Sequence, residues 1–316
     1  MRQKYFFSLG DGGFHRIAYT EWGDHDNPHV VVCVHGLARN SRDFDFLAEA
    51  LASDCRVVCM DVVGRGDSDW LDNKSEYAFS TYLADAAAML ARVTAPAAGT
   101  WLERLRGGPP PPMIDWVGTS MGGLIGMFLA AKRNAPIRRL VLNDVGAFIP
   151  WGALIRMKGS ITRGLRFSNL AEVEAYLRKV CESFGPLTDE QWKHLAIHSV
   201  AQEEKGDYVL RYDPAIGEGY HGNIDSEMPI GPNVLRGVDL WNIWGRLKCP
   251  TLVLRGAKSE VLPASTLKEM RERRPDTVTV EFEGVGHVPA LMSEDQIAPI
   301  DAQARNAATV SAMFGM

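Results

Sequence analysis

The sequence predicts an α/β fold, in which a mostly parallel, doubly wound sheet has helices on both faces and a helical cap is inserted into the chain. Short apolar runs, which are typical of strands covered on both faces, alternate along the chain with amphipathic helical patterns. The alternation stops after residue 146 and resumes at residue 247. We therefore expect a core of residues 1–146 and 247–316 and a helical cap of residues 147–246.

The expected strands follow three kinds of pattern. Two alternating runs, separated by the turn Gly10-Asp11-Gly12-Gly13, predict an antiparallel hairpin at the start of the chain. Continuous apolar runs predict the buried parallel strands that follow, and an alternating run predicts the last strand. In chain order, the expected strands are residues 4–9, 14–22, 30–34, 55–60, 113–117, 139–143, 251–254 and 277–282.

Helices are expected where apolar residues recur every three or four positions. Ser41 is suited to begin the first of them, because its hydroxyl can accept a hydrogen bond from a backbone N–H of the first turn. Residues 94–112 end in a run of prolines and predict a surface connection. The expected helices are residues 42–52, 77–93, 124–132, 263–273 and 296–313 in the core, and residues 170–184 and 188–201 in the cap.

The motif Gly118-x-Ser120-x-Gly122 joins an expected strand to an expected helix. A sharp turn from strand to helix leaves no room for side chains beside the serine, and the two glycines remove that obstacle. The serine can then hold a strained backbone and expose its hydroxyl, while the N-terminus of the following helix favours a developing negative charge. The pattern predicts that Ser120 is a nucleophile.

Two further residues at the ends of expected strands could complete this chemistry. Asp144 follows the strand after Ser120, and His287 follows the last strand in a tight loop. A serine hydroxyl is a poor nucleophile until a neutral imidazole takes its proton. The imidazole in turn needs a carboxylate that holds its tautomer and stabilises its charged form.

These motifs resemble those of the α/β-hydrolase superfamily, in its cap-bearing, serine esterase-like branch. His35-Gly36-Leu37 resembles the family's His-Gly turn, and Gly64-Arg65-Gly66-Asp67-Ser68 resembles its Gly-x-Gly-x-Ser turn. The resemblance implies that the backbone N–H groups of Leu37 and Met121 form an oxyanion hole. It also implies hydrolysis of a carboxylic ester through an acyl-enzyme, because epoxide hydrolases and haloalkane dehalogenases of this fold have an aspartate where this chain has Ser120.

The acid departs from the commonest pattern of the superfamily. Most members have an aspartate three residues after a glycine, at the end of the strand that follows the cap, where this chain has Ser259. A serine has no charge to stabilise an imidazolium, and Glu260 is offset by one residue. Some branches place the acid after the strand that follows the nucleophile. We therefore expect Asp144 to be the acid, with Ser259 hydrogen-bonded nearby and Glu260 as the alternative.

Other functions on the same scaffold are a carbon–carbon hydrolase of vinylogous diketones, a cofactor-free perhydrolase and a non-catalytic ligand receptor. The carbon–carbon hydrolases have a similar Ser-Met-Gly-Gly elbow. They usually have Asn before the serine and Trp after the histidine, where this chain has Thr119 and Val288. Turnover of a p-nitrophenyl ester would separate an enzyme from a receptor.

Composition and charge argue against several classes of partner. The net charge is −5 with both signs interspersed, and no basic run is dense enough for nucleic acid. Five cysteines without paired spacing are typical of reduced thiols in a cytoplasmic protein. No apolar run approaches the length of a membrane span or resembles a signal peptide. No cofactor is expected, and no metal either, since His194 and His198 lack a third ligand.

The expected cap carries two features that bear on the substrate. Its tryptophans suggest apolar walls, which suit a small-molecule ester with an apolar part; they are Trp151, Trp192, Trp241 and Trp244. Residues 151–170 contain basic residues and no acidic residue; the basic residues are Arg156, Lys158, Arg163 and Arg166. They form either a basic mouth that attracts acidic substrates or a solvated helix face.

Overall fold

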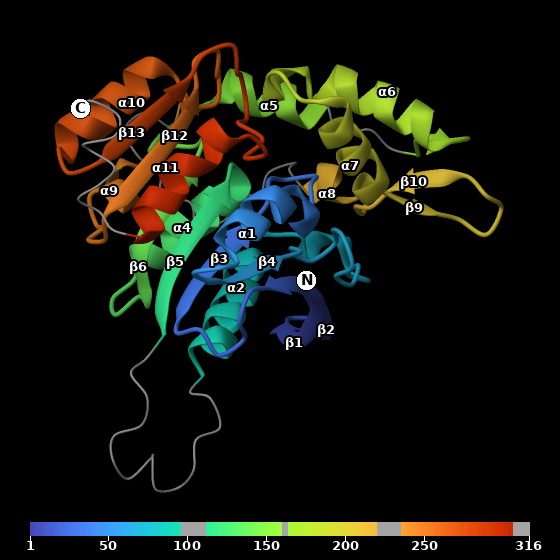
Figure 1. Ribbon diagram of the computed structural model, residues 1–316, viewed down its shortest axis with the longest axis horizontal. Coiled ribbons are helices and arrows are strands. Elements are labelled where there is room, and N and C mark those ends of the chain that lie inside the picture. Colours follow the sequence, from blue (N-terminus) through green and yellow to red (C-terminus); the bar gives the residue numbers. More distant parts are fainter. Residues whose placement is uncertain (96–111, 160–163, 220–234, 306–316) are drawn as a thin grey trace, which may run out of the picture.

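The computed structural model of the protein describes residues 1–95, 112–159, 164–219 and 235–305. An eight-stranded sheet forms its centre, with the strand order β1-β2-β4-β3-β5-β6-β12-β13. The first two strands pair antiparallel with each other, and β2 pairs antiparallel with β4, whereas the pairs from β4 to β13 are parallel. The predicted fold class, a mostly parallel doubly wound sheet, is therefore confirmed (Figure 1).

The bounds of the core elements agree with the patterns to within a few residues at most ends. The strands are β1 (Arg2–Gly10), β2 (Gly13–Trp22), β3 (His29–Val34), β4 (Arg56–Met60), β5 (Met113–Thr119), β6 (Ile137–Asn143), β12 (Thr251–Gly256) and β13 (Val278–Phe282). The helices are η1 (Ser41–Phe44), α1 (Asp45–Leu51), η2 (Lys74–Glu76), α2 (Phe79–Thr94), α4 (Met121–Ala130), α10 (Ala264–Arg273) and α11 (Glu294–Arg305).

Side chains of the parallel strands alternate between two hydrophobic clusters, one on each face of the sheet. Val30, Val32 and Val34 belong to the cluster that packs against α2 and α4. Val31 and Cys33 belong to the other cluster, which packs against α1 and α11. This double burial explains why the strands read as continuous apolar runs.

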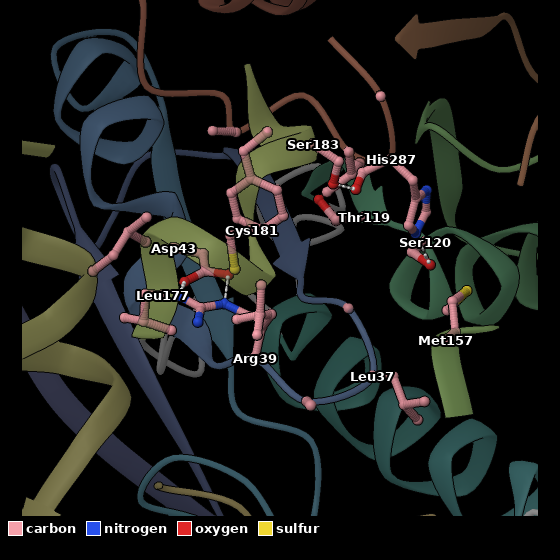
Figure 2. Close-up of a pocket in the computed structure, with 18 of the residues that line it drawn as sticks. Leu37, Arg39, Asp43, Thr119, Ser120, Met157, Leu177, Cys181, Ser183 and His287 are labelled. Carbon is pink, nitrogen blue, oxygen red and sulfur yellow. Dashed lines mark hydrogen bonds and ion pairs between the residues drawn. The ribbon is translucent and has the colours of Figure 1, made fainter. Parts of the chain in front are cut away.

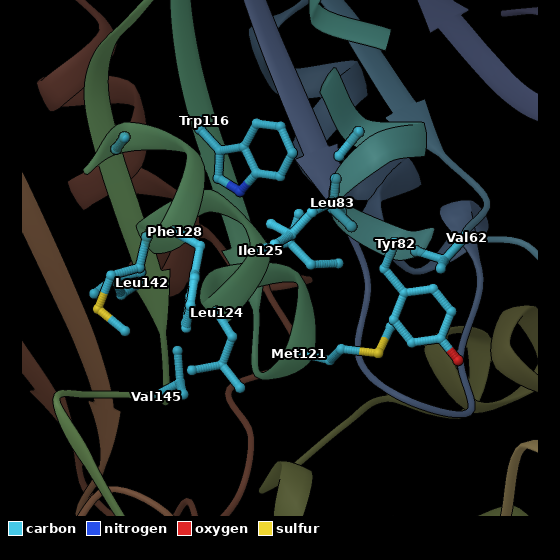
Figure 3. Packing of buried hydrophobic residues seen from close by; sticks show 14 of the residues in the cluster. Val62, Tyr82, Leu83, Trp116, Met121, Leu124, Ile125, Phe128, Leu142 and Val145 are labelled. Atoms are coloured by element: carbon cyan, nitrogen blue, oxygen red, sulfur yellow. The ribbon is translucent and has the colours of Figure 1, made fainter. Parts of the chain in front are cut away.

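Helix α4 is apolar on nearly all sides because the sheet, α2 and neighbouring loops surround it. Leu124, Ile125 and Phe128 of α4 lie among the buried side chains shown in Figure 3, which include Leu142 and Val145 on the β6 side. Met121, at the start of the helix, lies beside Tyr82 of α2 (Figure 3). This packing fixes the end of the helix that follows Ser120.

Between β6 and β12 the chain leaves the sheet, and α5, α6 and α7 lie together at one end of it (Figure 1). The sequence pattern predicts that this segment is helical, and here the structure differs, because short strands occur between the helices. They are too short for a period-two pattern to be visible in the sequence. The elements are β7 (Phe148–Pro150), α5 (Trp151–Gly159), β8 (Arg166–Phe167), α6 (Leu170–Val180), η3 (Glu182–Phe184), α7 (Asp189–Ser199), β9 (Val200–Gln202), β10 (Tyr208–Leu210), α8 (Ile216–Gly219), β11 (Gly237–Asp239) and α9 (Trp241–Trp244).

Several predicted helices end earlier or are divided. The predicted helix 42–52 is a 3-10 turn followed by α1, and the predicted helix 170–184 is α6 followed by the 3-10 turn η3. Of the predicted helix 296–313, residues 306–313 lie outside the described residues, as does most of the predicted connection 94–112. Within the described ranges, no helix combines the length and the apolar character that a membrane span needs.

Candidate active site

Ser120 occupies the sharp turn between β5 and α4, with φ of +51° and ψ of −112°. This backbone conformation is strained for a residue with a side chain. The two flanking glycines allow it, because a Cβ on Gly118 would lie 2.3 Å from the carbonyl oxygen of Gly122, and one on Gly122 would lie 2.0 Å from that of Val34. The indole of Trp116 also donates a hydrogen bond to the Gly122 carbonyl, 3.0 Å away.

The structure brings Ser120, His287 and Asp144 together from three strand ends. Nε2 of His287 lies 3.0 Å from Oγ of Ser120, and Nδ1 lies 2.6 Å from Oδ2 of Asp144 (Figure 2 shows the Ser120–His287 contact). The Asp144 side chain is fully buried, whereas that of His287 is 20% exposed. The geometry lets the imidazole accept the serine proton while Nδ1–H donates to the carboxylate.

The buried carboxylate of Asp144 has a polar partner on each oxygen. The backbone N–H of Gly256 donates to Oδ1 at 3.0 Å, and the hydroxyl of Ser259 donates to Oδ2 at 2.5 Å. These partners reduce the cost of burying the charge. Glu260 lies elsewhere: its side chain is 67% exposed and pairs with Arg156 at 2.6 Å.

The loop after β3 is held in place by two buried side chains. His35 donates from Nδ1 to the Gly36 carbonyl at 2.6 Å, and its Nε2 accepts the N–H of Val62 at 3.0 Å. Burial lowers the pKa of His35 to about 4, so the ring is neutral, as this hydrogen-bonding pattern requires. Arg65 donates from Nε to the Leu37 carbonyl at 2.9 Å. A Cβ on Gly36 would lie 3.8 Å from Cβ of Ser120, so this loop borders the serine.

Two residues near Ser120 and His287 were not singled out from the sequence. Asn143, fully buried at the end of β6, donates from Nδ2 to the hydroxyl of Thr119 at 3.1 Å and to the carbonyl of Pro289 at 2.9 Å. The hydroxyl of Ser183 donates to the His287 carbonyl, and its backbone carbonyl accepts the N–H of Gly286 at 2.7 Å. Both residues therefore tie the histidine loop to another element. Asn143 could have been found from the sequence, because it is a polar residue at the end of an expected strand. Nothing in the sequence around Ser183 indicates its contact with the histidine loop.

A cavity of about 720 Å³ lies beside Ser120, large enough for a small organic ligand. It is lined by the loops of the sheet and by the segment between β6 and β12, with apolar side chains that include Leu37, Met157, Leu177, Leu195, Val261 and Met292. The cap tryptophans are not among the lining residues in the described part of the chain. Trp192 and Trp244 lie inside hydrophobic clusters, and Trp151 and Trp241 pack against one.

The described basic residues of the stretch 151–170 do not form a single basic patch at the mouth of the cavity. Arg156 lines the cavity but pairs with Glu260, and Arg166 pairs with Glu203 on the surface. The side chain of Lys158 and the whole of Arg163 lie outside the described residues.

His194 and His198 have a possible third metal ligand that their spacing in the sequence did not reveal. Asp45 of α1 joins them, and one ligand atom from each of the three residues lies within 4.8 Å of the others. However, the guanidinium of Arg42 pairs with Asp45 and lies 3.2 Å from Nδ1 of His198. The Arg42 guanidinium is thus already the partner of two of the three candidate ligands.

Comparison with known proteins gives a consistent result. A model of the alpha/beta hydrolase family matches residues 31–300. A 3-hydroxybutyrate-oligomer hydrolase of Cupriavidus necator is 39% identical over 293 residues, which cover 92% of this chain and 93% of the relative. A pimeloyl-(acyl-carrier protein) methyl ester esterase of Chromobacterium violaceum is 25% identical and covers 84% of this chain and 89% of the relative.

Among solved structures, an alpha/beta hydrolase of Novosphingobium aromaticivorans superposes with a TM-score of 0.78 and 31% identity, and the match covers 96% of this chain and 98% of that chain. The family model covers most of this chain, and relatives named as a hydrolase and an esterase match nearly its full length. The chain therefore belongs to the alpha/beta hydrolase family and is a hydrolase.

Proposed function

We propose that the protein is a serine hydrolase that cleaves carboxylic esters through an acyl-enzyme. The observation that carries this proposal is the hydrogen-bonded series Ser120–His287–Asp144, with contacts of 3.0 and 2.6 Å. In this mechanism Oγ of Ser120 attacks the ester carbonyl while Nε2 of His287 takes the hydroxyl proton. His287 then gives the proton to the leaving alcohol and activates the water that releases the acid.

The developing oxyanion needs hydrogen-bond donors that are already in place. The backbone N–H groups of Leu37 and Met121 suit this role, because Leu37 follows the glycine that borders Ser120 and Met121 begins the helix behind it. Neither N–H has an acceptor among the residues that the structure describes. In the proposal both donate to the tetrahedral intermediate.

Residues 1–146 and 247–316 form the core of the enzyme in this proposal, and residues 147–246 form its cap. The cap closes the cavity over Ser120 with residues such as Met157, Leu177 and Leu195, which support an apolar substrate. The relative from Cupriavidus necator is named for the hydrolysis of 3-hydroxybutyrate oligomers. We therefore propose short oligoesters of a 3-hydroxy acid as the substrate class.

The test is hydrolysis of a 3-hydroxybutyrate trimer by the wild type and by Ser120→Ala. By comparison with other serine hydrolases, the variant should lose about 10⁵–10⁶-fold in kcat. A fluorescent alkyl phosphonate should label the wild type once per chain and should not label the variant. A vinylogous diketone serves as the competing substrate. Retained trimer turnover in Ser120→Ala, or faster cleavage of the diketone than of every ester tested, would contradict the proposal.

A further inference from the structure

We propose that Arg39 binds the free carboxylate of the substrate and thereby selects the ester bond next to that end of a hydroxy-acid oligomer, an inference that rests on the proposed function. Arg39 lies three residues after Gly36, at the end of the loop that borders Ser120, and lines the same cavity. Figure 2 shows the Arg39–Asp43 pair and the Ser120–His287 pair at separate places in this cavity. The cavity thus has two polar regions, and its lining also includes apolar side chains such as Leu37 and Leu177.

The Arg39 guanidinium is fixed by neighbours that leave part of it free. Nε and Nη2 donate to the two oxygens of Asp43 at 2.8 and 2.5 Å, and Nη1 donates to the hydroxyl of Ser199 at 3.0 Å. A guanidinium has five N–H groups. One N–H on each terminal nitrogen therefore has no acceptor among the described residues. A substrate carboxylate can accept a charge-assisted hydrogen bond from these free N–H groups.

The surroundings of Arg39 favour an anionic ligand over a neutral one. The Arg39 side chain is 15% exposed, so water competes little for its donors. Burial alone would lower the pKa of Arg39, but Asp43 outweighs this effect and raises it, so the group stays charged. The cavity lining has one more cationic than anionic side chain: Arg39, Arg156, Arg211 and Lys258 against Asp43, Glu182 and Glu260.

Binding the carboxylate at Arg39 determines the order of product release. When Oγ of Ser120 bonds to the ester carbonyl carbon, the bond from that carbon to the alkoxide oxygen breaks. The leaving alkoxide belongs to the unit whose carboxylate Arg39 holds, and His287 protonates it to a hydroxy acid. The rest of the oligomer remains as the acyl group on Ser120 until water releases it.

The experiment compares a 3-hydroxybutyrate trimer that has a free carboxylate with the same trimer as its methyl ester. The wild type should have a lower KM for the acid. Because a hydrogen bond to a charged group contributes about 1.5–3 kcal/mol, Arg39→Gln should raise the KM for the acid about 10–100-fold more than the KM for the methyl ester. Arg39→Lys keeps the charge but not the planar pair of donors, so its effect should be intermediate. Lys258→Gln removes an exposed cation of the same lining and should keep the wild-type ratio.

Removing Arg39 leaves Asp43 without its partner, so the double variant Arg39→Gln/Asp43→Asn is measured in parallel and should show the same change in ratio. Equal effects on the acid and the methyl ester, in the single and the double variant, would overturn the carboxylate assignment. An equal effect of Lys258→Gln would replace it by a general attraction of the cavity for anions. In both cases p-nitrophenyl butyrate would still be hydrolysed through Ser120. A failure of the proposed function would instead appear as p-nitrophenyl butyrate turnover that survives Ser120→Ala.

Discussion

The two walls of the cavity are built differently. The core wall consists of loops at the ends of the sheet strands, with Gly36 to Phe44, Ser120 and His287, and there backbone packs on backbone. The second wall, which we call the cap wall, consists of lining residues between Ala153 and Tyr212. It meets the core through side chains and through separate backbone hydrogen bonds, such as the one from the Gly286 N–H to the Ser183 carbonyl. A Cβ on Gly122 would lie 2.0 Å from a backbone oxygen, whereas one on Gly152 of α5 would meet only the end of the Arg156 side chain, at 3.5 Å.

This difference in packing assigns the reaction to the core wall and the selection of the substrate to the cap wall. Catalytic groups must be held to within fractions of an ångström, and close backbone packing at strand ends supplies that precision. Substrate selection can be altered by changing side chains on a wall that packs less tightly against the core. Effects on kcat are therefore expected from the core wall, and effects on KM mainly from the cap wall and from the residues that meet it.

After Ser120 itself, the largest effect on kcat should come from Asp144 on the core wall. Asp144→Asn removes the charge that stabilises the protonated His287, and by analogy with serine proteases it should lower kcat about 10⁴-fold. Glu260→Gln removes an exposed carboxylate whose partner is Arg156, so its kcat should stay within about twofold of wild type. Steady-state kinetics on a short oligoester distinguish them. If Glu260→Gln gave the large loss and Asp144→Asn did not, the acid would be Glu260.

The positions of Ser120, Asp144 and His287 were predictable because each follows a strand that is recognisable from its own apolar or alternating pattern. Parallel strands bring their carboxyl ends to one edge, so local signals were enough to predict that these residues meet. The contact of Arg39 with Ser199 joins residues 160 positions apart and depends on how the segment between β6 and β12 packs. Nothing in the local pattern of either residue indicates that contact. Among the described residues, the tryptophans of residues 147–246 do not line the cavity as composition suggested, because composition does not reveal which way a side chain faces.

A pair of glycine variants tests the structural side of the comparison. Gly122→Ala should prevent folding or destabilise the protein by more than about 4 kcal/mol, because the new methyl group collides with the Val34 carbonyl and backbone cannot move aside cheaply. Gly152→Ala, in a helix with open space, should be neutral or stabilise by up to about 1 kcal/mol. Urea unfolding followed by circular dichroism measures both. Equal losses would mean that the two walls pack with the same tightness.

Ser183 is the point where the cap wall reaches the chemistry. Ser183→Ala removes the hydroxyl that donates to the His287 carbonyl but keeps the backbone contact with Gly286. Because one neutral hydrogen bond contributes about 1 kcal/mol, kcat should fall about two- to tenfold.

Ser265→Ala, at an exposed position of α10, is the matched control and should be silent. If Ser183 positions the histidine, Ser183→Ala should lower kcat and shift the pH at half-maximal kcat, without a change in KM alone. Ser183→Thr, which keeps a hydroxyl, should restore both values. A change in KM alone would make Ser183 part of the substrate wall instead.

The smallest effect concerns the junction of α7 with the core. Nδ1 of His198 lies 3.2 Å from Nη1 of Arg42 and accepts from it, which requires a neutral ring. Burial, with contributions from Arg42 and His194, lowers the pKa of His198 from 6.5 to about 4. In the unfolded chain the ring therefore takes up a proton at a higher pH than in the folded protein. Acidification from pH 6.5 towards 4 should thus favour unfolding.

His198→Gln removes this linkage, so its melting temperature should fall less than that of the wild type between pH 7 and pH 5. The difference between the two proteins isolates His198 from His35, whose pKa also lies at about 4 but which stays in both. The ring is partly accessible, so the difference should be only a few degrees, well below the effect of losing a core contact. If the melting temperatures of the wild type and of His198→Gln fall equally between pH 7 and pH 5, protonation of His198 does not destabilise the junction of α7 with the core. The junction of α7 with the core would then depend on other contacts, such as those of Arg39 with Ser199 and of Ser183 with His287.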